Sequence, residues 1–332
     1  MSAFKARGAF SQLETIRCRM ADGVRWEQTA CPSCGSHDEE EFLRAPGDDG
    51  VEYRLAKCRR CAMVFQNPRP DEATVGLLYT EDYPQYQAPA RKHSMLRALK
   101  HKLLGHAEKT LADRIPVTPG GRLLDCGCGA GAFAAEMRTR GWDAFGMDFS
   151  PHAAATARSH YGLRVVEGSL PHPEVPPGSV DVITLRMVLE HVHNPAKMLG
   201  AAFDAMKPGG WLFVAVPNLA AWGFGAFGPA WFPLRLPWHL LHFTPDTLSR
   251  AVATNGFTID TVATKAHTRW MGYSVDRARK SRPRWWLGAA RVRFFRSVLT
   301  NWTQWRGQAD ELSLLARKPD VKATEMPVRH AA

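Results

Sequence analysis

A glycine-rich turn is the stretch of this sequence with the clearest chemical meaning. Glycine occupies alternate positions, Gly127, Gly129 and Gly131, between a predicted strand that ends near Asp125 and a predicted helix. Glycine lets a backbone bend sharply and brings amide groups close to a ligand, and the helix N-terminus adds unpaired N–H groups. The next predicted strand ends on Asp148, where a carboxylate can hydrogen-bond ribose hydroxyls. The pattern therefore predicts a nucleotide site.

Two Cys-x-x-Cys pairs near the N-terminus have the spacing of metal ligands. The four thiols belong to Cys31, Cys34, Cys58 and Cys61. Each pair places two thiolates on one tight turn, and two such turns complete a tetrahedral sulfur site with strands between them, as in a zinc ribbon. Four thiolates leave no open position, so we expect structural Zn²⁺ rather than a catalytic metal.

Three histidines are candidates for acid–base chemistry. His191 follows the fourth predicted strand, and His239 and His242 lie in the segment 237–245. Ligands of open α/β sheets bind at the carboxyl ends of the strands, and the pKa of histidine suits a general base. There are structural alternatives: His191 could tie the cofactor loop in place within a helix, and the other two could cap the helix that follows Thr244.

The elements that must position these side chains predict an α/β fold. Seven predicted strands cover 122–125, 143–147, 163–166, 180–185, 211–216, 257–263 and 311–318. The predicted helices are 93–115, 132–140, 151–161, one that begins at Val188, and 248–255. Alternating strands and helices of this kind favour a doubly wound, mainly parallel sheet.

The chain divides into successive regions. We expect a lead-in over 1–30, the zinc ribbon and its connecting segment over 31–90, the α/β domain over 91–318 and a disordered tail over 319–332. Within the α/β domain, 217–243 is crowded with aromatic residues. This composition predicts a packed lid over an apolar or sugar-bearing substrate, with ring faces that would also suit a pyranose.

A basic insertion at 269–306 carries most of the net charge of +11. It contains ten Lys and Arg residues against Asp276 alone, together with seven Trp and Phe residues. Arginine and tryptophan on an amphipathic helix favour contact with an anionic membrane. Nucleic acid and a merely solvated helical cap are the alternatives. Acidic residues at 38–41 would repel phosphate, so nucleic-acid binding through the ribbon is not expected.

Composition bounds the class of protein. The chain has 332 residues, and 45% of them are hydrophobic, as in a folded protein. No apolar run is long enough for a transmembrane helix, and the first twenty residues lack the apolar core of a secretory signal. Seven cysteines, an odd number, suit a reducing compartment. We expect a cytoplasmic protein, either free or peripheral at the inner face of the membrane.

The motifs together resemble the class I S-adenosylmethionine (AdoMet) dependent methyltransferases. Asp125 and the spacing Gly-x-Gly-x-Gly fit motif I of that family, and the segments 188–195 and 207–213 also resemble it. The resemblance implies a Rossmann-like, seven-stranded α/β sheet whose last strand is antiparallel. It also implies AdoMet binding, with Ser169 and Leu170 beside the adenine.

The flanking segments are similar to narrower groups. The ribbon followed by Asn-Pro-Arg-Pro (67–70) looks like the front part of methyltransferases that modify sugars and cell-surface polysaccharides, and 237–245 resembles a motif of the same group, which implies that His239 is the base. Glu190-His191 resembles the Glu-x-x-Glu-His metal motif of ubiquinone-pathway O-methyltransferases. Met187 occupies the position of the first glutamate, so we expect that metal site to be incomplete.

The expected function is AdoMet-dependent methyl transfer to oxygen or carbon of a sugar, glycan or lipid-linked saccharide. One alternative is an O-methyltransferase that acts on a lipophilic aromatic or quinone. The non-enzymatic alternative is a zinc-ribbon protein that binds nucleic acid, against which the complete motif I argues.

Overall fold

The structure, a computed structural model, describes most of the chain. The described residues are 23–80, 86, 115, 120–281 and 293–320. The helix predicted over 93–115 and the tail predicted over 319–332 therefore lie largely outside them. Within these residues, no helix combines the length and the apolar character that a membrane crossing requires.

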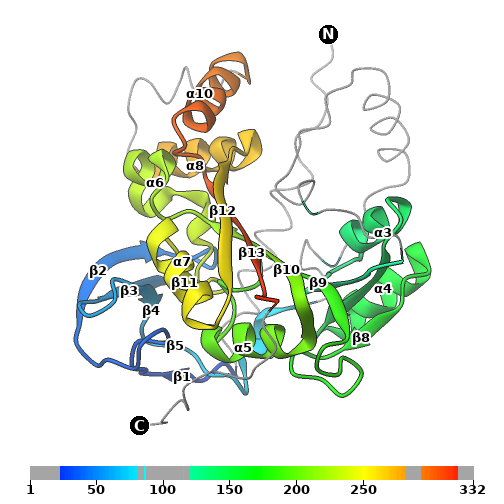
Figure 1. Cartoon of the computed structure of the whole chain (residues 1–332). Coiled ribbons are helices and arrows are strands. Elements are labelled where there is room, and N and C mark those ends of the chain that lie inside the picture. Colours follow the sequence, from blue (N-terminus) through cyan, green and yellow to red (C-terminus); the bar gives the residue numbers. More distant parts are fainter. Residues whose placement is uncertain (1–22, 81–85, 87–114, 116–119, 282–292, 321–332) are drawn as a thin grey trace.

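A seven-stranded mixed sheet forms the centre of the molecule (Figure 1). In spatial order its strands are β12 (Thr258–Lys265), β13 (Glu311–Arg317), β10 (Met206–Pro217), β9 (Val180–Arg186), β6 (Arg122–Cys126), β7 (Asp143–Asp148) and β8 (Val165–Glu167). The pairs among β8, β7, β6, β9 and β10 are parallel, whereas β13 is antiparallel to both of its neighbours. This order and the single reversed strand confirm the predicted fold class.

Short polar residues cap three of the four helices beside the sheet, and Gly131 occupies the N-cap position of the other one. Their bounds are α3 (Ala132–Thr139), α4 (Pro151–Tyr161), α5 (Pro195–Ala205) and α7 (Pro245–Thr254). Ser150 caps α4, Asn194 caps α5 and Thr244 caps α7, each with proline in the first turn. The helix predicted to begin at Val188 is wrong at its start, because the Asn194 cap and Pro195 set the first turn of α5.

The cysteine-bearing module shares a sheet and a core with the α/β domain. In order, the second sheet contains β11 (Leu241–His242), β4 (Val64–Gln66), β3 (Glu52–Cys58) and β2 (Glu39–Pro46). A two-stranded pair, β1 (Trp26–Glu27) with β5 (Arg69–Pro70), lies beside it, and a 3₁₀ helix covers Val75–Leu78. β11 comes from the segment just before α7, so this segment joins the two modules.

The aromatic segment and the basic insertion form a helical layer at one end of the molecule (Figure 1). It contains α6 (Trp222–Phe227), the 3₁₀ helices Gly228–Ala230 and Phe232–Leu234, α8 (Thr268–Ser281) and α10 (Arg293–Trp305). Its core includes Trp231, which is 1% exposed and donates a hydrogen bond of 2.8 Å from Nε1 to Asp310 Oδ1. The prediction that these aromatic faces are open to a sugar ring is therefore wrong for Trp231, whose ring packs beneath α8 and against the ribbon.

Candidate functional site

The predicted glycine turn connects β6 to α3 and takes a shape that only glycine adopts easily. The φ angles of Gly127, Gly129 and Gly131 are 67°, 51° and 83°, all in the left-handed region. A Cβ at position 127 would lie 2.5 Å from Val188 Cγ2, and a Cβ at position 131 would lie 2.8 Å from Ala157 Cβ. The loop thus presents bare backbone at the start of α3, as a nucleotide-binding turn requires. We call this loop, with Asp125 and Asp148, the donor edge.

Two buried carboxylates hold the donor edge in shape. Asp148 accepts hydrogen bonds from Gly129 N–H (2.8 Å) and from Ser150 N–H (2.9 Å). Asp125 accepts one from the Thr184 hydroxyl (2.6 Å), and burial raises its pKa to about 6. Asp148 at the end of β7 therefore binds the glycine loop directly, whereas Asp125, next to the last residue of β6, is held by Thr184 of β9.

The predicted adenine residues follow β8. Ser169 is exposed, whereas Leu170 is 4% exposed and belongs to the hydrophobic core. Of this pair, only Ser169 therefore offers its side chain at the surface, and Leu170 supports the loop from below.

A second group of side chains meets at the carboxyl end of β9. One metal-ligating atom from each of Glu190, His191 and His239 lies within 4.8 Å of the others. Tyr79 joins them, because its hydroxyl lies 2.9 Å from His191 Nδ1 and its ring contacts Phe149 edge-on at 5.1 Å. We call Tyr79, Glu190, His191 and His239 the acceptor edge.

Hydrogen bonds to carbonyl groups fix the tautomers of two of these histidines. Nδ1 of His239 lies 2.8 Å from Pro233 O, and Nδ1 of His191 lies 2.9 Å from Trp238 O. A carbonyl can only accept, so each Nδ1 carries the proton and each Nε2 keeps its lone pair. Burial lowers the pKa of His191 to about 4 and that of His239 well below its usual value, so both rings are neutral at pH 7.

Sequence reasoning missed Glu190 as a candidate in its own right. This side chain is 0% exposed, and neither carboxyl oxygen has a hydrogen-bond partner among the described residues. Burial raises its pKa to about 8, so the carboxyl is protonated at neutral pH. A buried polar group without a partner is costly, which marks this position as one that a bound acceptor or cation would satisfy.

The predicted Glu-x-x-Glu-His metal motif stays incomplete at Met187, although another donor lies nearby. Met187 cannot act as a carboxylate ligand, but His239 approaches from a distant segment and supplies a third donor beside Glu190 and His191. Two imidazoles and one carboxylate form a donor set that fits a divalent transition-metal cation. No local spacing in the sequence indicates this grouping.

His242 lies apart from this group, in β11. It is 3% exposed, its Nε2 has no hydrogen-bond partner among the described residues, and burial lowers its pKa to about 3. The alternative that His239 and His242 cap α7 is wrong, because Thr244 forms the capping box with Thr247. The alternative that His191 sits in a helix is also wrong, since it lies in the turn before α5.

The four cysteines come together as predicted. Cys31 and Cys61 place their Sγ atoms 3.5 Å apart, and those of Cys34 and Cys58 are 3.6 Å apart. Zinc with Zn–S bonds of about 2.3 Å in a tetrahedron would separate its sulfurs by about 3.8 Å. The thiols thus fit a closed Cys₄ site, and the zinc ribbon remains a prediction that this geometry supports.

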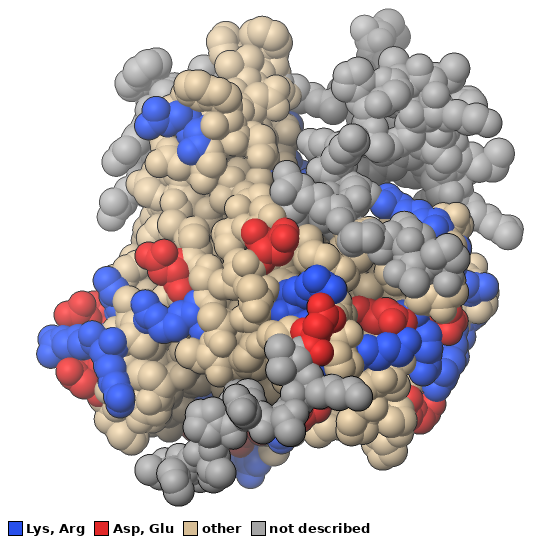
Figure 2. All heavy atoms as spheres, viewed as in Figure 1, with Lys and Arg blue, Asp and Glu red and all other residues tan. Residues whose placement is uncertain are grey.

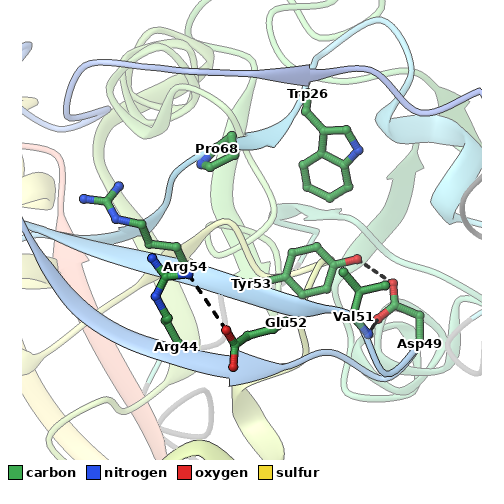
Figure 3. A pocket seen from close by; sticks show the side chains of 8 residues that line it. All are labelled: Trp26, Arg44, Asp49, Val51, Glu52, Tyr53, Arg54 and Pro68. Atoms are coloured by element: carbon green, nitrogen blue, oxygen red, sulfur yellow. Dashed lines mark hydrogen bonds and ion pairs between the residues drawn. The ribbon is translucent and has the colours of Figure 1, made fainter.

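A hollow of about 480 Å³ lies on the ribbon module (Figure 3). The rings of Trp26 and Tyr53 stack there at 5.5 Å, beside Arg44 and Arg54. The charged side chains pair within the module, Arg54 with Glu39 at 2.9 Å for example. All its lining residues belong to the ribbon module and its flanks, so this hollow is separate from the donor edge and the acceptor edge.

Comparison with known proteins agrees with the nucleotide-binding character of the donor edge. The family model described as a methyltransferase domain matches residues 92–262. Curated relatives include ubiquinone biosynthesis O-methyltransferases from Bordetella pertussis, 32% identical over 136 residues (39% of this chain, 55% of the relative), and from Burkholderia vietnamiensis, 34% identical over 126 residues (36% and 54%). The chain thus spans about half the length of the curated relatives it matches.

Solved structures with a similar fold include AdoMet-dependent methyltransferases from two organisms. That from Methanosarcina mazei is 16% identical with a TM-score of 0.45 and covers 64% of this chain and 98% of its own. That from Mesorhizobium loti is 21% identical with a TM-score of 0.43 and covers 62% and 95%. The family match extends over half of the sequence. It argues against the alternative that the chain is a non-enzymatic zinc-ribbon protein that binds nucleic acid. With its glycine loop, paired carboxylates and reversed seventh strand, the chain belongs to the methyltransferase-domain family and is a class I AdoMet-dependent methyltransferase.

Proposed function

We propose that the enzyme methylates an oxygen or carbon of a saccharide, either a free sugar, a glycan or a lipid-linked sugar, with His239 as the base. One observation carries the proposal: a buried, hydrogen-bonding acceptor edge adjoins the donor edge. Val188 packs against the glycine loop, and Phe149, one residue after Asp148, contacts Tyr79 of the acceptor edge. A methyl group held at the first edge therefore faces groups that can bind and deprotonate an acceptor at the second.

The residues of the two edges have distinct tasks. AdoMet, when bound, supplies an electrophilic methyl group. The bare backbone of the glycine loop would let AdoMet approach closely, and the Asp148 carboxylate would accept hydrogen bonds from its ribose. His239 presents an unprotonated Nε2 because its Nδ1 donates to Pro233 O, so it is ready to take the acceptor proton at neutral pH.

The polar character of the acceptor edge favours a saccharide. The protonated Glu190 carboxyl can donate and accept, and the Tyr79 hydroxyl lies close by. An acceptor with several hydroxyl groups would satisfy these atoms better than an apolar ring with a single hydroxyl group. The resemblance of the ribbon and of 237–245 to sugar-modifying methyltransferases supports the same class.

A lipophilic aromatic or quinone acceptor is the second candidate. The curated relatives are named ubiquinone biosynthesis O-methyltransferases, and the grouping of Glu190, His191 and His239 fits a divalent cation. Such a cation would polarise adjacent oxygens of a dihydroxy ring and lower their pKa.

For the N-terminal module we propose that Cys31, Cys34, Cys58 and Cys61 hold a structural zinc ion.

Transfer of radiolabelled methyl from AdoMet tests the two acceptor classes. One arm offers sugar nucleotides and lipid-linked saccharides, and the other offers dihydroxy aromatics, each with Mn²⁺ or with a chelator that spares the zinc. We expect label in the saccharide arm, unchanged by chelation and lost in His239→Ala. Cation-dependent label in the aromatic arm alone would select the second candidate, and label in neither arm would overturn both.

A further inference from the structure

Helix α10 packs with its apolar face outward. Its exposed apolar side chains are Phe294 (70%), Phe295 (54%), Val298 (53%), Trp302 (40%) and Trp305 (79%). At 3.6 residues per turn these five positions fall within an arc of about 100°, with Val298 near its centre. One continuous stripe of large apolar groups is therefore presented to the surroundings.

The opposite face of α10 is polar and is the face that packs on the protein. Thr300 and Thr303 are 3% and 1% exposed, and Arg296 lies against Gly272 of α8. Gln304 fixes the end of the helix, since its amide bonds both Thr264 O and Ala266 N–H at 2.7 Å. These contacts set the rotation of α10, so the outward direction of the apolar stripe is specified by the fold.

Helix α7 shows the usual arrangement. Its apolar residues Leu248, Ala251 and Val252 are buried against the core, and its exposed face carries Asp246, Arg250 and Thr254. In α10 the apolar residues face outward instead. Five exposed side chains of this size form a patch and not scattered single groups, and such a patch indicates an apolar partner outside the described residues.

Exposed basic side chains lie on α8 and directly after α10, and acidic residues are scarce on both helices. α10 has no acidic residue, and α8 beside it has only Asp276. Arg269, Lys280 and Arg306 are exposed, and Arg306 lies over the Trp302 ring at 5.9 Å. Figure 2 shows the part of the surface over α10 as tan, with blue basic groups at its side and no red acidic ones.

We propose that this surface, the apolar stripe of α10 with Arg269, Lys280 and Arg306, docks the enzyme on an anionic lipid membrane. The helix would lie in the plane of the interface, with the Phe and Trp rings among the acyl chains and the basic groups near lipid phosphates. The proposal does not depend on which acceptor the enzyme methylates.

The charge and the side-chain types favour lipid over other occupants. A two-fold contact between copies of the chain would place the same basic groups opposite one another, where they repel. Nucleic acid would stack its bases on aromatic rings, but the centre of the stripe is Val298, which has no ring. A lipid surface supplies both the apolar interior and the negative charge.

Vesicle flotation with the full, zinc-loaded chain tests the proposal. Vesicles of phosphatidylcholine containing phosphatidylglycerol are compared with vesicles of phosphatidylcholine alone. We expect binding to the anionic vesicles and a partition coefficient lower by about tenfold or more on neutral ones, in high salt, or in the variant Phe294→Ser/Val298→Ser/Trp305→Ser. Its control is Val51→Ser/Leu77→Ser, at apolar positions that are 51% and 56% exposed on the ribbon module, which should bind like the wild type.

Several outcomes would overturn the proposal. These are equal vesicle binding by the triple variant and the wild type, no vesicle binding by either, or a dimer in light scattering that the triple variant dissociates. Salt-sensitive binding to single-stranded RNA, lost in the triple variant in the absence of vesicle binding, would assign the stripe to nucleic acid. Unchanged AdoMet affinity and circular dichroism show that each variant is folded.

Discussion

The donor edge and the acceptor edge adjoin one another but are built differently. All residues of the donor edge lie within 125–148, in one strand–loop–helix–strand unit. The acceptor edge takes Tyr79 from the ribbon side, Glu190 and His191 from the turn after β9, and His239 from the segment before β11. The Tyr79–His191 contact alone joins residues 112 positions apart. Donor binding is thus encoded locally, whereas acceptor chemistry depends on how distant segments pack.

We expect the largest effect on turnover from a substitution of His239, which should impair the acceptor edge and leave AdoMet binding at the donor edge intact. We expect His239→Ala to lower kcat by about 10²–10⁴-fold, because the base is lost, while the Kd for AdoMet changes by less than about twofold. Single-turnover methyl transfer and calorimetry measure the two quantities. His160→Ala, on the exposed side of α4, is the control. Equal losses in kcat and in AdoMet affinity would show that the edges are not separable.

Loss of zinc should damage the acceptor edge through the shared sheet. Cys58 and Cys61 pack in the same core as Leu240 and Leu241, and β4 pairs with β11. We expect Cys58→Ser to lose its zinc ion and to lower the Tm by about 10 °C. Cys128→Ser, which changes a cysteine of the donor loop, should keep its zinc in a metal-release assay. A Cys58→Ser protein that retains zinc and full stability would contradict the Cys₄ site.

Acid should destabilise the contact between β4 and β11, which connects the ribbon module to the α/β domain, before it destabilises the donor edge. His242 has its pKa lowered to about 3, so the unfolded chain binds its proton below about pH 6.5 and the folded chain does not. Stability is therefore present above pH 6.5 and falls as the pH drops toward 3. His242→Phe should reduce the loss of unfolding free energy between pH 7 and pH 4.5 by about 2–3 kcal/mol in urea titrations. An identical pH dependence in the variant and the wild type would place the acid sensitivity elsewhere.

Tyr79→Phe should give the smallest effect. The change removes the hydroxyl that lies 2.9 Å from His191 Nδ1 but keeps the ring against Phe149. Because His191 retains its bond to Trp238 O, we expect kcat/KM to fall by only about two- to tenfold. Steady-state kinetics with the identified acceptor measures it. A loss as large as that of His239→Ala would make Tyr79 a direct participant in proton transfer.

The sequence predicts the donor edge well because its signals are local. Alternate glycines, an acid at the end of each strand and a following helix pattern all lie within one unit, and each requirement is visible in the residue types. The Cys-x-x-Cys pairs are local in the same sense, since each turn brings its own two thiols together. The seven-stranded sheet and its antiparallel last strand follow from the family resemblance.

The acceptor edge and α10 show what local patterns leave out. His239 reaches Glu190 only because Leu240 and Leu241 N–H groups bond to Glu190 O, at 2.7 and 3.0 Å, a contact between segments 50 positions apart. The aromatic composition of 217–243 predicted a lid whose ring faces suit a pyranose, but Trp231 is buried in a core that it shares with residues of α8 and of the ribbon. The amphipathic pattern of α10 is visible in the sequence, whereas the outward direction of its apolar face follows from tertiary contacts of Gln304 and Arg296.

Calorimetric titration with AdoMet tests the central claim most directly. Gly129 has a φ of 51° and its N–H bonds Asp148, so Gly129→Arg should distort the donor edge. Gly178 has a φ of 63° with open space around it, which makes Gly178→Arg the matched control. We predict micromolar binding by the wild type and by Gly178→Arg, and none by Gly129→Arg. Folded, zinc-loaded wild-type protein that does not bind AdoMet, or Gly129→Arg protein that binds it as well as the wild type, would contradict the account.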